Sequence, residues 1–187
     1  MKKFAISLIL MTLVIFLASS SIGLAEESAD RLRNQLDRIS FDVLNRMYNK
    51  FPETYNEVGD AYAYCTISSS SVKLGRWDSD HGRGVAVNNV TGKKVYVKMH
   101  EVKIGLNIGA KEYDLLFIIT DETAWKKFVS GKIKFDTEVI DGVNGDDYND
   151  AKNIADGVYF YQLDKKGLPL DLTLKDAKIS PIRSLNK

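Results

Sequence analysis

The chain has 187 residues, a net charge of +1, and a hydrophobic content of 44%. That length is enough for one domain with a proper core. The near-neutral charge argues against a general polyanion binder, such as a protein that binds nucleic acid. The single cysteine, Cys65, excludes an internal disulfide framework, and its place in an alternating segment predicts a buried small side chain.

Residues 1–25 have the form of a secretory signal peptide. Lys2 and Lys3 give a basic start, residues 4–18 are apolar, and small residues precede a cleavage position after Ala25. The apolar run is short for a membrane-spanning helix, and an uncleaved anchor is the alternative. We therefore predict an exported protein, periplasmic or extracellular, whose mature part covers residues 26–187. Without Lys2 and Lys3 the net charge falls from +1 to −1.

Residues 26–52 predict an amphipathic helix of about five turns, with Ser28 as its N-cap and Pro52 beyond its end. Its apolar stripe is predicted to pack on a sheet formed by residues 53–187, so that both parts fold as one unit. The alternative is a helix that lies on a membrane surface. The apolar positions recur at spacings of three and four and are Leu32, Leu36, Ile39, Val43 and Met47.

Short alternating segments typical of strands follow this helix. Residues 61–67 form one strand, and residues 85–87 and 93–99 form a hairpin around the turn at 88–92. Residues 102–109 alternate with Gly105 and Gly109 on one face, and residues 115–119 are apolar on both faces, as in a central strand. We interpret these last two segments as the centre on which the rest of the chain packs.

The C-terminal third predicts one inserted helix and further strands. Asp121 is a suitable N-cap and Gly131 a suitable stop for the helix. Residues 132–139 predict a strand, residues 158–162 and 168–174 predict a hairpin, and the tail after Pro181 is expected to be frayed. The fold class is therefore α+β, with a mainly antiparallel sheet that can curl towards a barrel, an N-terminal amphipathic helix and one short inserted helix.

Catalytic and metal sites have little support in the sequence. His81 lies beside aspartates, but the only other histidine, His100, has no metal-ligand spacing to it. The acidic loop at residues 136–150 could hold calcium, yet its spacing is not that of an EF-hand, and a solvated loop is the preferred interpretation. The serines near Ser69 lack a nucleophile motif. We predict a protein that is not an enzyme and that needs no metal or cofactor.

Lysines are concentrated in one part of the chain. From Lys93 to Lys134 there are nine lysines against five acidic residues, whereas residues 136–150 contain six acidic residues. This separation predicts a basic patch, and each lysine near an anionic membrane contributes about 1 kcal/mol. The alternative for each one is an ordinary solvated side chain. The candidate lipid-binding lysines are Lys93, Lys94, Lys98, Lys103, Lys111, Lys126 and Lys127.

The order of these motifs resembles the SYLF lipid-binding domain family over about residues 55–180. Residues 102–110, VKIGLNIGA, are similar to the family's SxGxQxGxQ strand, and they are followed by the acidic Asp114, an apolar strand, a short helix and the FVSG segment at 128–131. Residues 82–85 resemble its Gly-x-Gly strand start, and residues 158–161 and 167–174 resemble its closing strand and hairpin. The glycines that we expect to be structural are Gly82, Gly84, Gly105, Gly109 and Gly131.

This resemblance implies a non-catalytic domain that binds lipids, which for an exported protein are the phospholipids of the cell envelope. Together with the charge separation, it leads to the hypothesis that the lysines dock anionic phospholipid at a membrane surface. The N-terminal helix or the face bearing Gly105 and Gly109 would then contact acyl chains. The alternative hypothesis is a structural or protein-interaction module of the envelope without a lipid ligand.

Overall fold

A computed structural model describes residues 2–70, 82–100, 103–104, 112–135, 152–164, 166, 172–174 and 177–187. For residues 2–25, 103–104, 152 and 172–173 it describes the backbone. The helices are α1 (Lys2–Lys50), α2 (Thr54–Asp60) and α3 (Glu122–Val129), with a short 3₁₀ helix η2 (Arg183–Leu185). The strands are β1 (Ala63–Ser68), β2 (Gly82–Asn88), β3 (Lys94–His100), β4 (Lys103–Ile104), β5 (Tyr113–Ile119), β6 (Lys152–Ala155), β7 (Val158–Asp164), β8 (Leu172–Thr173) and β9 (Lys178–Pro181).

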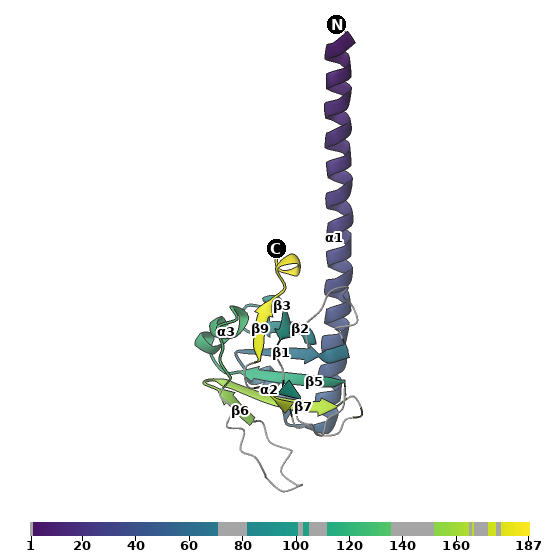
Figure 1. Ribbon diagram of the computed structural model, residues 1–187. Coiled ribbons are helices and arrows are strands. Elements are labelled where there is room, and N and C mark those ends of the chain that lie inside the picture. The colour runs from purple at the N-terminus through teal and green to yellow at the C-terminus, as the bar shows by residue number, and fades with distance from the viewer. Residues whose placement is uncertain are drawn as a thin grey trace.

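Seven strands form one antiparallel sheet in the order β6–β7–β5–β1–β2–β3–β9 (Figure 1). Ile154 of β6 and Ile179 of β9 lie at opposite edges of this order, yet both belong to one core cluster with Phe117 of β5. The sheet curls, and its concave face wraps around this cluster (Figure 1). The structure thus confirms the predicted α+β class and the curled, antiparallel sheet.

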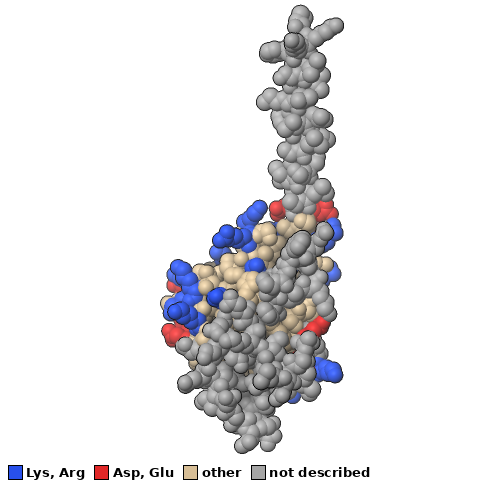
Figure 2. Space-filling view, viewed as in Figure 1, with Lys and Arg blue, Asp and Glu red and all other residues tan. Residues whose placement is uncertain are grey.

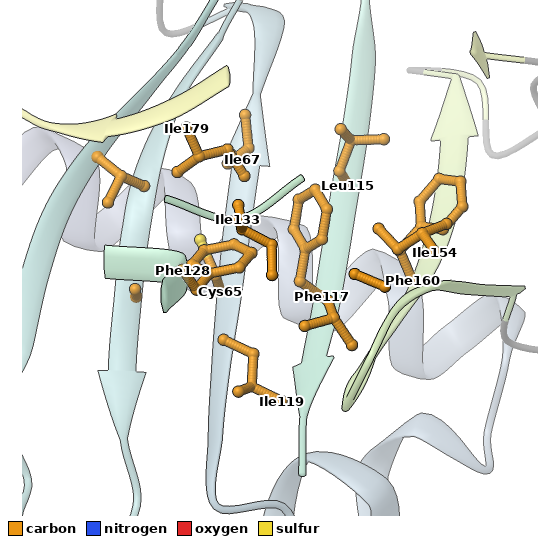
Figure 3. Packing of buried hydrophobic residues seen from close by; sticks show 14 of the residues in the cluster. Cys65, Ile67, Leu115, Phe117, Ile119, Phe128, Ile133, Ile154, Phe160 and Ile179 are labelled. Atoms are coloured by element: carbon orange, nitrogen blue, oxygen red, sulfur yellow. The ribbon is translucent and has the colours of Figure 1, made fainter. Parts of the chain in front are cut away.

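The concave face of the sheet encloses the main core (Figure 3). Phe117 of β5 lies 5.3 Å from Phe128 of α3 and 6.1 Å from Phe160 of β7, measured between ring centroids. Cys65 of β1 is 0% exposed within the same cluster, and burial raises the pKa of its thiol well above the usual value. The predicted buried role of Cys65 is confirmed.

Local signals define α3 as predicted. The carboxylate of Asp121 accepts hydrogen bonds from the backbone N–H groups of Thr123 and Ala124, which is the geometry of an N-cap. Gly131 ends the helix with a φ of +73°, a conformation that glycine adopts without strain. The helix then lies against β9, at the edge of the sheet.

The opposite face of the sheet is covered by α1. Leu36, Val43 and Met47 are all 0% exposed, so the predicted packing of the apolar stripe on the sheet is confirmed. The N-terminal part of α1 projects well beyond the sheet (Figure 1). Among the described residues, none of the helices has an apolar stretch of the length needed to cross a membrane.

Polar contacts also join α1 to the sheet, next to the apolar contacts of Leu36, Val43 and Met47. The Arg46 guanidinium donates to the carboxylate of Asp114 on β5, with N···O distances of 2.8 and 2.6 Å, and Asp114 is 0% exposed. The Thr66 hydroxyl on β1 donates to the Ser40 hydroxyl at 2.6 Å. Because each pair needs one relative position of helix and sheet, these contacts fix the register of α1 on the strands beneath it.

The start of α1 differs from the prediction. Ser28 lies inside a continuous helix and does not cap it, since α1 begins at Lys2. No proline occurs before Pro52, so nothing in the sequence interrupts helix propagation through residues 26–28. The cap signal at Ser28 was therefore misleading, while the end of the helix before Pro52 was correct.

The centre of the sheet also differs from the prediction. The middle strand is β1, flanked by β5 and β2, and the apolar segment at 115–119 lies in β5 as expected. The described part of the segment 102–109 is only β4, which pairs with β8 outside the main sheet. Alternation shows which face a residue occupies but not which strand is the partner. Residues 105–111, with Gly105, Gly109 and Lys111, lie outside the described residues.

Two further strand predictions were wrong. β7 forms its hairpin with β6, through a turn in which Gly157 has a φ of +70°, whereas β8 pairs with β4. The segment 168–174 therefore does not supply the hairpin partner of β7. Residues 132–135, the described part of the segment 132–139, form no strand. Their amides are used at the end of α3, where Lys132 and Ile133 both donate to the Lys127 carbonyl.

Candidate anion-binding surface

The C-terminal segment extends the edge of the sheet beyond β9. β9 pairs with residues 97–100 of β3 and leaves Tyr96 without a strand partner on that side. The side chain of Asn186 takes this place: its Oδ1 accepts the Tyr96 N–H at 2.8 Å, and its Nδ2 donates to the Tyr96 carbonyl at 2.7 Å. The Ile182 N–H donates to the same carbonyl at 2.9 Å. The prediction of a frayed tail was wrong, because one further backbone bond and the amide side chain of Asn186 continue the edge of the sheet past β9.

Helix α1 holds the same segment from the other side. The Arg33 guanidinium donates to the Leu185 carbonyl at 3.0 Å, and Leu185 is buried in a cluster with Leu36 of α1. Hydrogen bonds to Asp30 and Glu26 raise the pKa of Arg33 and orient its guanidinium. The C-terminal segment is thus fixed by both β3 and α1.

A hollow of about 350 Å³ lies where the start of β3, the C-terminal segment and the end of α3 meet. We call it the basic hollow. It combines three lysine side chains with a few apolar ones, and its lining residues are Lys93, Lys94, Val95, Val129, Leu185, Asn186 and Lys187.

One of these lysines is positioned by α1. The Lys94 ammonium lies 2.8 Å from the carboxylate of Asp37, which also accepts a long hydrogen bond of 3.4 Å from the Tyr96 hydroxyl. Burial, followed by the negative charge of Asp37, raises the pKa of Tyr96, so that its hydroxyl stays a neutral donor. Lys93 is exposed beside this group.

The predicted lysines fall into separate groups. Lys93 and Lys94 line the basic hollow, while Lys126 and Lys127 are exposed on the last turn of α3. Lys126 forms an ion pair of 2.8 Å with Glu122, and the accompanying hydrogen bond raises the pKa of Lys126. Basic side chains gather over α3 and near the C-terminal turn on the face shown in Figure 2.

The remaining members of the predicted set are not part of the hollow as described. Lys98 is half-buried in the middle of β3, opposite Ser180 of β9. The side chain of Lys103 and the whole of Lys111 lie outside the described residues. The structure therefore brings together only part of the lysine set that the sequence suggested.

Sequence reasoning missed Lys187, because the tail was expected to be frayed. A signal was present, since Ile179, Ile182 and Leu185 recur every third residue, and a tail with such a period can pack on a core. In the structure Ile179 and Leu185 are buried. That packing brings Lys187 to the basic hollow.

The glycines at the start of β2 permit a close approach to β1. A Cβ placed on Gly84 would lie 1.6 Å from the Thr66 carbonyl oxygen, and one on Gly82 would lie 2.7 Å from the Ile67 Cγ2. At Gly131, a Cβ would lie 3.0 Å from the Ile179 carbonyl oxygen of β9. These positions serve the fold and do not line the basic hollow.

Metal binding has no support in the described part of the chain. Within it, no three His, Cys, Asp or Glu side chains come together in a way that could hold a metal ion. The two candidates from the sequence, His81 and the acidic loop at residues 136–150, lie outside the described residues.

Comparison with protein families and with curated proteins gives one relative of interest. No family model matches the chain. The protein named beta cell expansion factor A, from Aeromonas veronii, is 27% identical over 152 residues. The similar region covers 81% of this chain but 58% of the relative, so the chain spans less than two thirds of that protein. The name of this relative does not identify a ligand.

Proposed function

We propose that the protein is an exported, non-catalytic domain that binds anionic phospholipid headgroups at a membrane surface. The observation that carries this proposal is the convergence of Lys93 and Lys187, beside the ion-paired Lys94, on one hollow with a fixed backbone. Lysine ammonium groups are strong donors to phosphate oxygens. A headgroup phosphate would lie among the lysines, and Val95, Val129 and Leu185 would contact the glycerol or the first methylene groups.

The surroundings of the hollow support the same proposal. Lys126 and Lys127 extend the basic surface along α3, where exposed charges act on a membrane over a distance of about 8 Å at physiological salt. The predicted signal peptide would place the protein where it meets envelope phospholipids. The resemblance to the SYLF family, which was drawn from the sequence alone, points to lipids as well.

The proposal is tested by co-sedimentation of the full chain with vesicles of phosphatidylglycerol or phosphatidylcholine over a salt series. The test variant is Lys93→Gln/Lys187→Gln. The control is Lys50→Gln/Lys166→Gln, which removes the same charge from exposed positions that do not line the hollow. We expect the test variant to bind anionic vesicles about thirtyfold more weakly, from about fivefold for each lysine, and the control to lose far less.

The N-terminal apolar segment is common to all three proteins, so any contribution that it makes to vesicle binding cancels in the comparison. Equal losses in both variants would show that charge alone matters and would remove the hollow from the proposal. If the wild type binds neither kind of vesicle, the alternative of a structural or protein-interaction module of the envelope becomes the better one.

A further inference from the structure

A second pocket, of about 420 Å³, lies on the α1-facing side of the sheet, where α2 ends. α2 packs on this face through Val58, which belongs to one cluster with Ile118 of β5 and Tyr161 of β7, and it ends at Asp60 before the chain enters β1. The consequence is visible along β7, because Tyr161 is 3% exposed whereas Tyr159, two residues earlier on the same face, is 37% exposed. The lining residues are Glu57, Asp60, Ala61, Ile118, Thr120 and Tyr159.

The charge in this pocket has a single sign. Glu57 and Asp60 supply two carboxylates, and none of the lining residues in the described part of the chain is basic. Glu57 is held in place because its carboxylate accepts a hydrogen bond of 2.8 Å from the Tyr161 hydroxyl. Asp60 is exposed at the mouth of the pocket. A cation entering here would meet one carboxylate held by Tyr161 and one exposed carboxylate.

The rest of the lining suits the apolar part of such a ligand. Ile118 and Ala61 give it an apolar part, and Tyr159, which is 37% exposed, adds an aromatic ring to the lining. A π face attracts ammonium and quaternary ammonium groups, and pockets of this size generally combine apolar walls with a few polar groups that orient the ligand. We infer that this pocket is a binding site for a small organic cation, an ammonium or quaternary ammonium group attached to an apolar body.

This inference is independent of the proposed lipid binding. The basic hollow lies at the β3–β9 end of the sheet, and the acidic pocket lies over β5 and β7, with β1 and β2 between them. An anionic ligand suited to the first site would be repelled by Glu57 and Asp60 at the second. A variant that loses phospholipid binding at the basic hollow should therefore still bind the cation at the acidic pocket, and the reverse should also hold.

The test uses benzyltrimethylammonium as the cationic probe, with benzyl alcohol as a neutral comparison and benzoate as an anionic one. Binding to the full chain is measured by ligand-observed NMR. We expect saturable binding of the cation that is at least severalfold tighter than that of the alcohol, and none of benzoate. Asp60→Asn should weaken binding of the cation about threefold, the size typical of losing one partner of an exposed ion pair.

Two further variants separate the ring from the hydroxyl of Tyr159. Tyr159→Leu should weaken binding about threefold through loss of the π face, whereas Tyr159→Phe should retain it. Asp42→Asn, on an exposed position of α1 that does not line the pocket, is the matched charge control and should bind as the wild type does. The inference is overturned if the alcohol binds as tightly as the cation, if Asp42→Asn weakens binding as much as Asp60→Asn, or if no saturable binding is found.

Discussion

Replacement of Gly84 by alanine tests the close approach of β1 and β2 at the centre of the sheet. Gly84 is paired with Ile67, and its added Cβ would lie 1.6 Å from the carbonyl oxygen of Thr66, where ordinary contacts are 3.4–4 Å. The backbone is the obstacle, so no side-chain rotation relieves the clash. The two strands must separate locally by about 2 Å, which is enough to break hydrogen bonds that need N···O distances near 3 Å.

The cost follows from the bonds that are lost. Separation at Gly84 breaks about two ladder bonds, and each buried bond contributes about 1 kcal/mol, with more lost where a group stays unsatisfied. β1 is the middle strand, so water cannot easily replace the lost partners. We expect Gly84→Ala to lower the free energy of unfolding by about 3 kcal/mol.

Urea unfolding measures this loss, and two other glycines serve as controls. Gly59→Ala lies in α2 with nothing within 4 Å of the added Cβ, so it should stabilise the protein by about 0.5–1 kcal/mol. Gly82→Ala should fall between the two, since its added Cβ meets a movable Ile67 side chain. If Gly84→Ala lowers the free energy of unfolding by less than Gly82→Ala does, the close approach of the two backbones is not the reason why position 84 requires glycine.

Three further predictions concern stability. Arg46→Met should cost about 3 kcal/mol in urea unfolding, because it removes the guanidinium that pairs with the fully buried carboxylate of Asp114. This is the low end for a broken buried pair, since Arg46 is one third exposed. Asn186→Ala should cost about 2 kcal/mol, chiefly from the two part-buried hydrogen bonds with Tyr96, since the third, to the Ile182 carbonyl, is exposed. Hydrogen exchange should then become faster at the β3 edge while remaining slow in β1. Burial raises the pKa values of Cys65 and Tyr113 above their ordinary values of 9.0 and 10.0, so the unfolded chain loses protons that the folded one keeps. Stability should therefore fall as pH rises above about 9, by about 1.4 kcal/mol per pH unit for each ionised group, and Cys65→Ala/Tyr113→Phe should flatten this decline. An unchanged slope in that double variant would contradict the role given to the two groups.

Elements that rest on local chemistry could be predicted from the sequence. Asp121 and Gly131 mark the ends of α3 because an N-cap and a left-handed stop need only a few neighbouring residues. The burial of Leu36, Val43 and Met47 follows from helical spacing alone. In each case the signal and its effect lie within one or two turns of the chain.

Strand pairing could not be predicted in the same way, because it depends on distant partners. β4 and β8 each have two residues, and they pair with each other outside the main sheet, a partnership that their own alternation does not indicate. β6 was missed because Lys152–Ala155 contains one strongly apolar residue, Ile154, which is too little for a period.

The candidate sites show the same limit. The density of lysines along the sequence pointed to Lys93 and Lys94. Lys187 comes to lie beside them because the side-chain amide of Asn186 hydrogen-bonds to the backbone of Tyr96. The acidic pocket depends on where α2 ends relative to β7, which brings Asp60 near Tyr159. These residues are far apart in the sequence, so no local sequence pattern predicts that they meet.

The buried stripe of α1 bears on how the proposed membrane contact would be made. Using the apolar face of α1 on a membrane would require Leu36, Val43 and Met47 to leave the sheet, and each such side chain is worth about 1.5–3 kcal/mol when fully buried. The three together approach the stability of a typical domain, about 5–15 kcal/mol, before the Arg46–Asp114 pair is counted. The basic hollow needs no such rearrangement, because its lysines already lie at the surface on a backbone fixed by β3 and α1. Under the proposed function, binding through the lysines of the docked structure is therefore the less costly route, and its affinity should fall with salt, as screening of exposed charges requires.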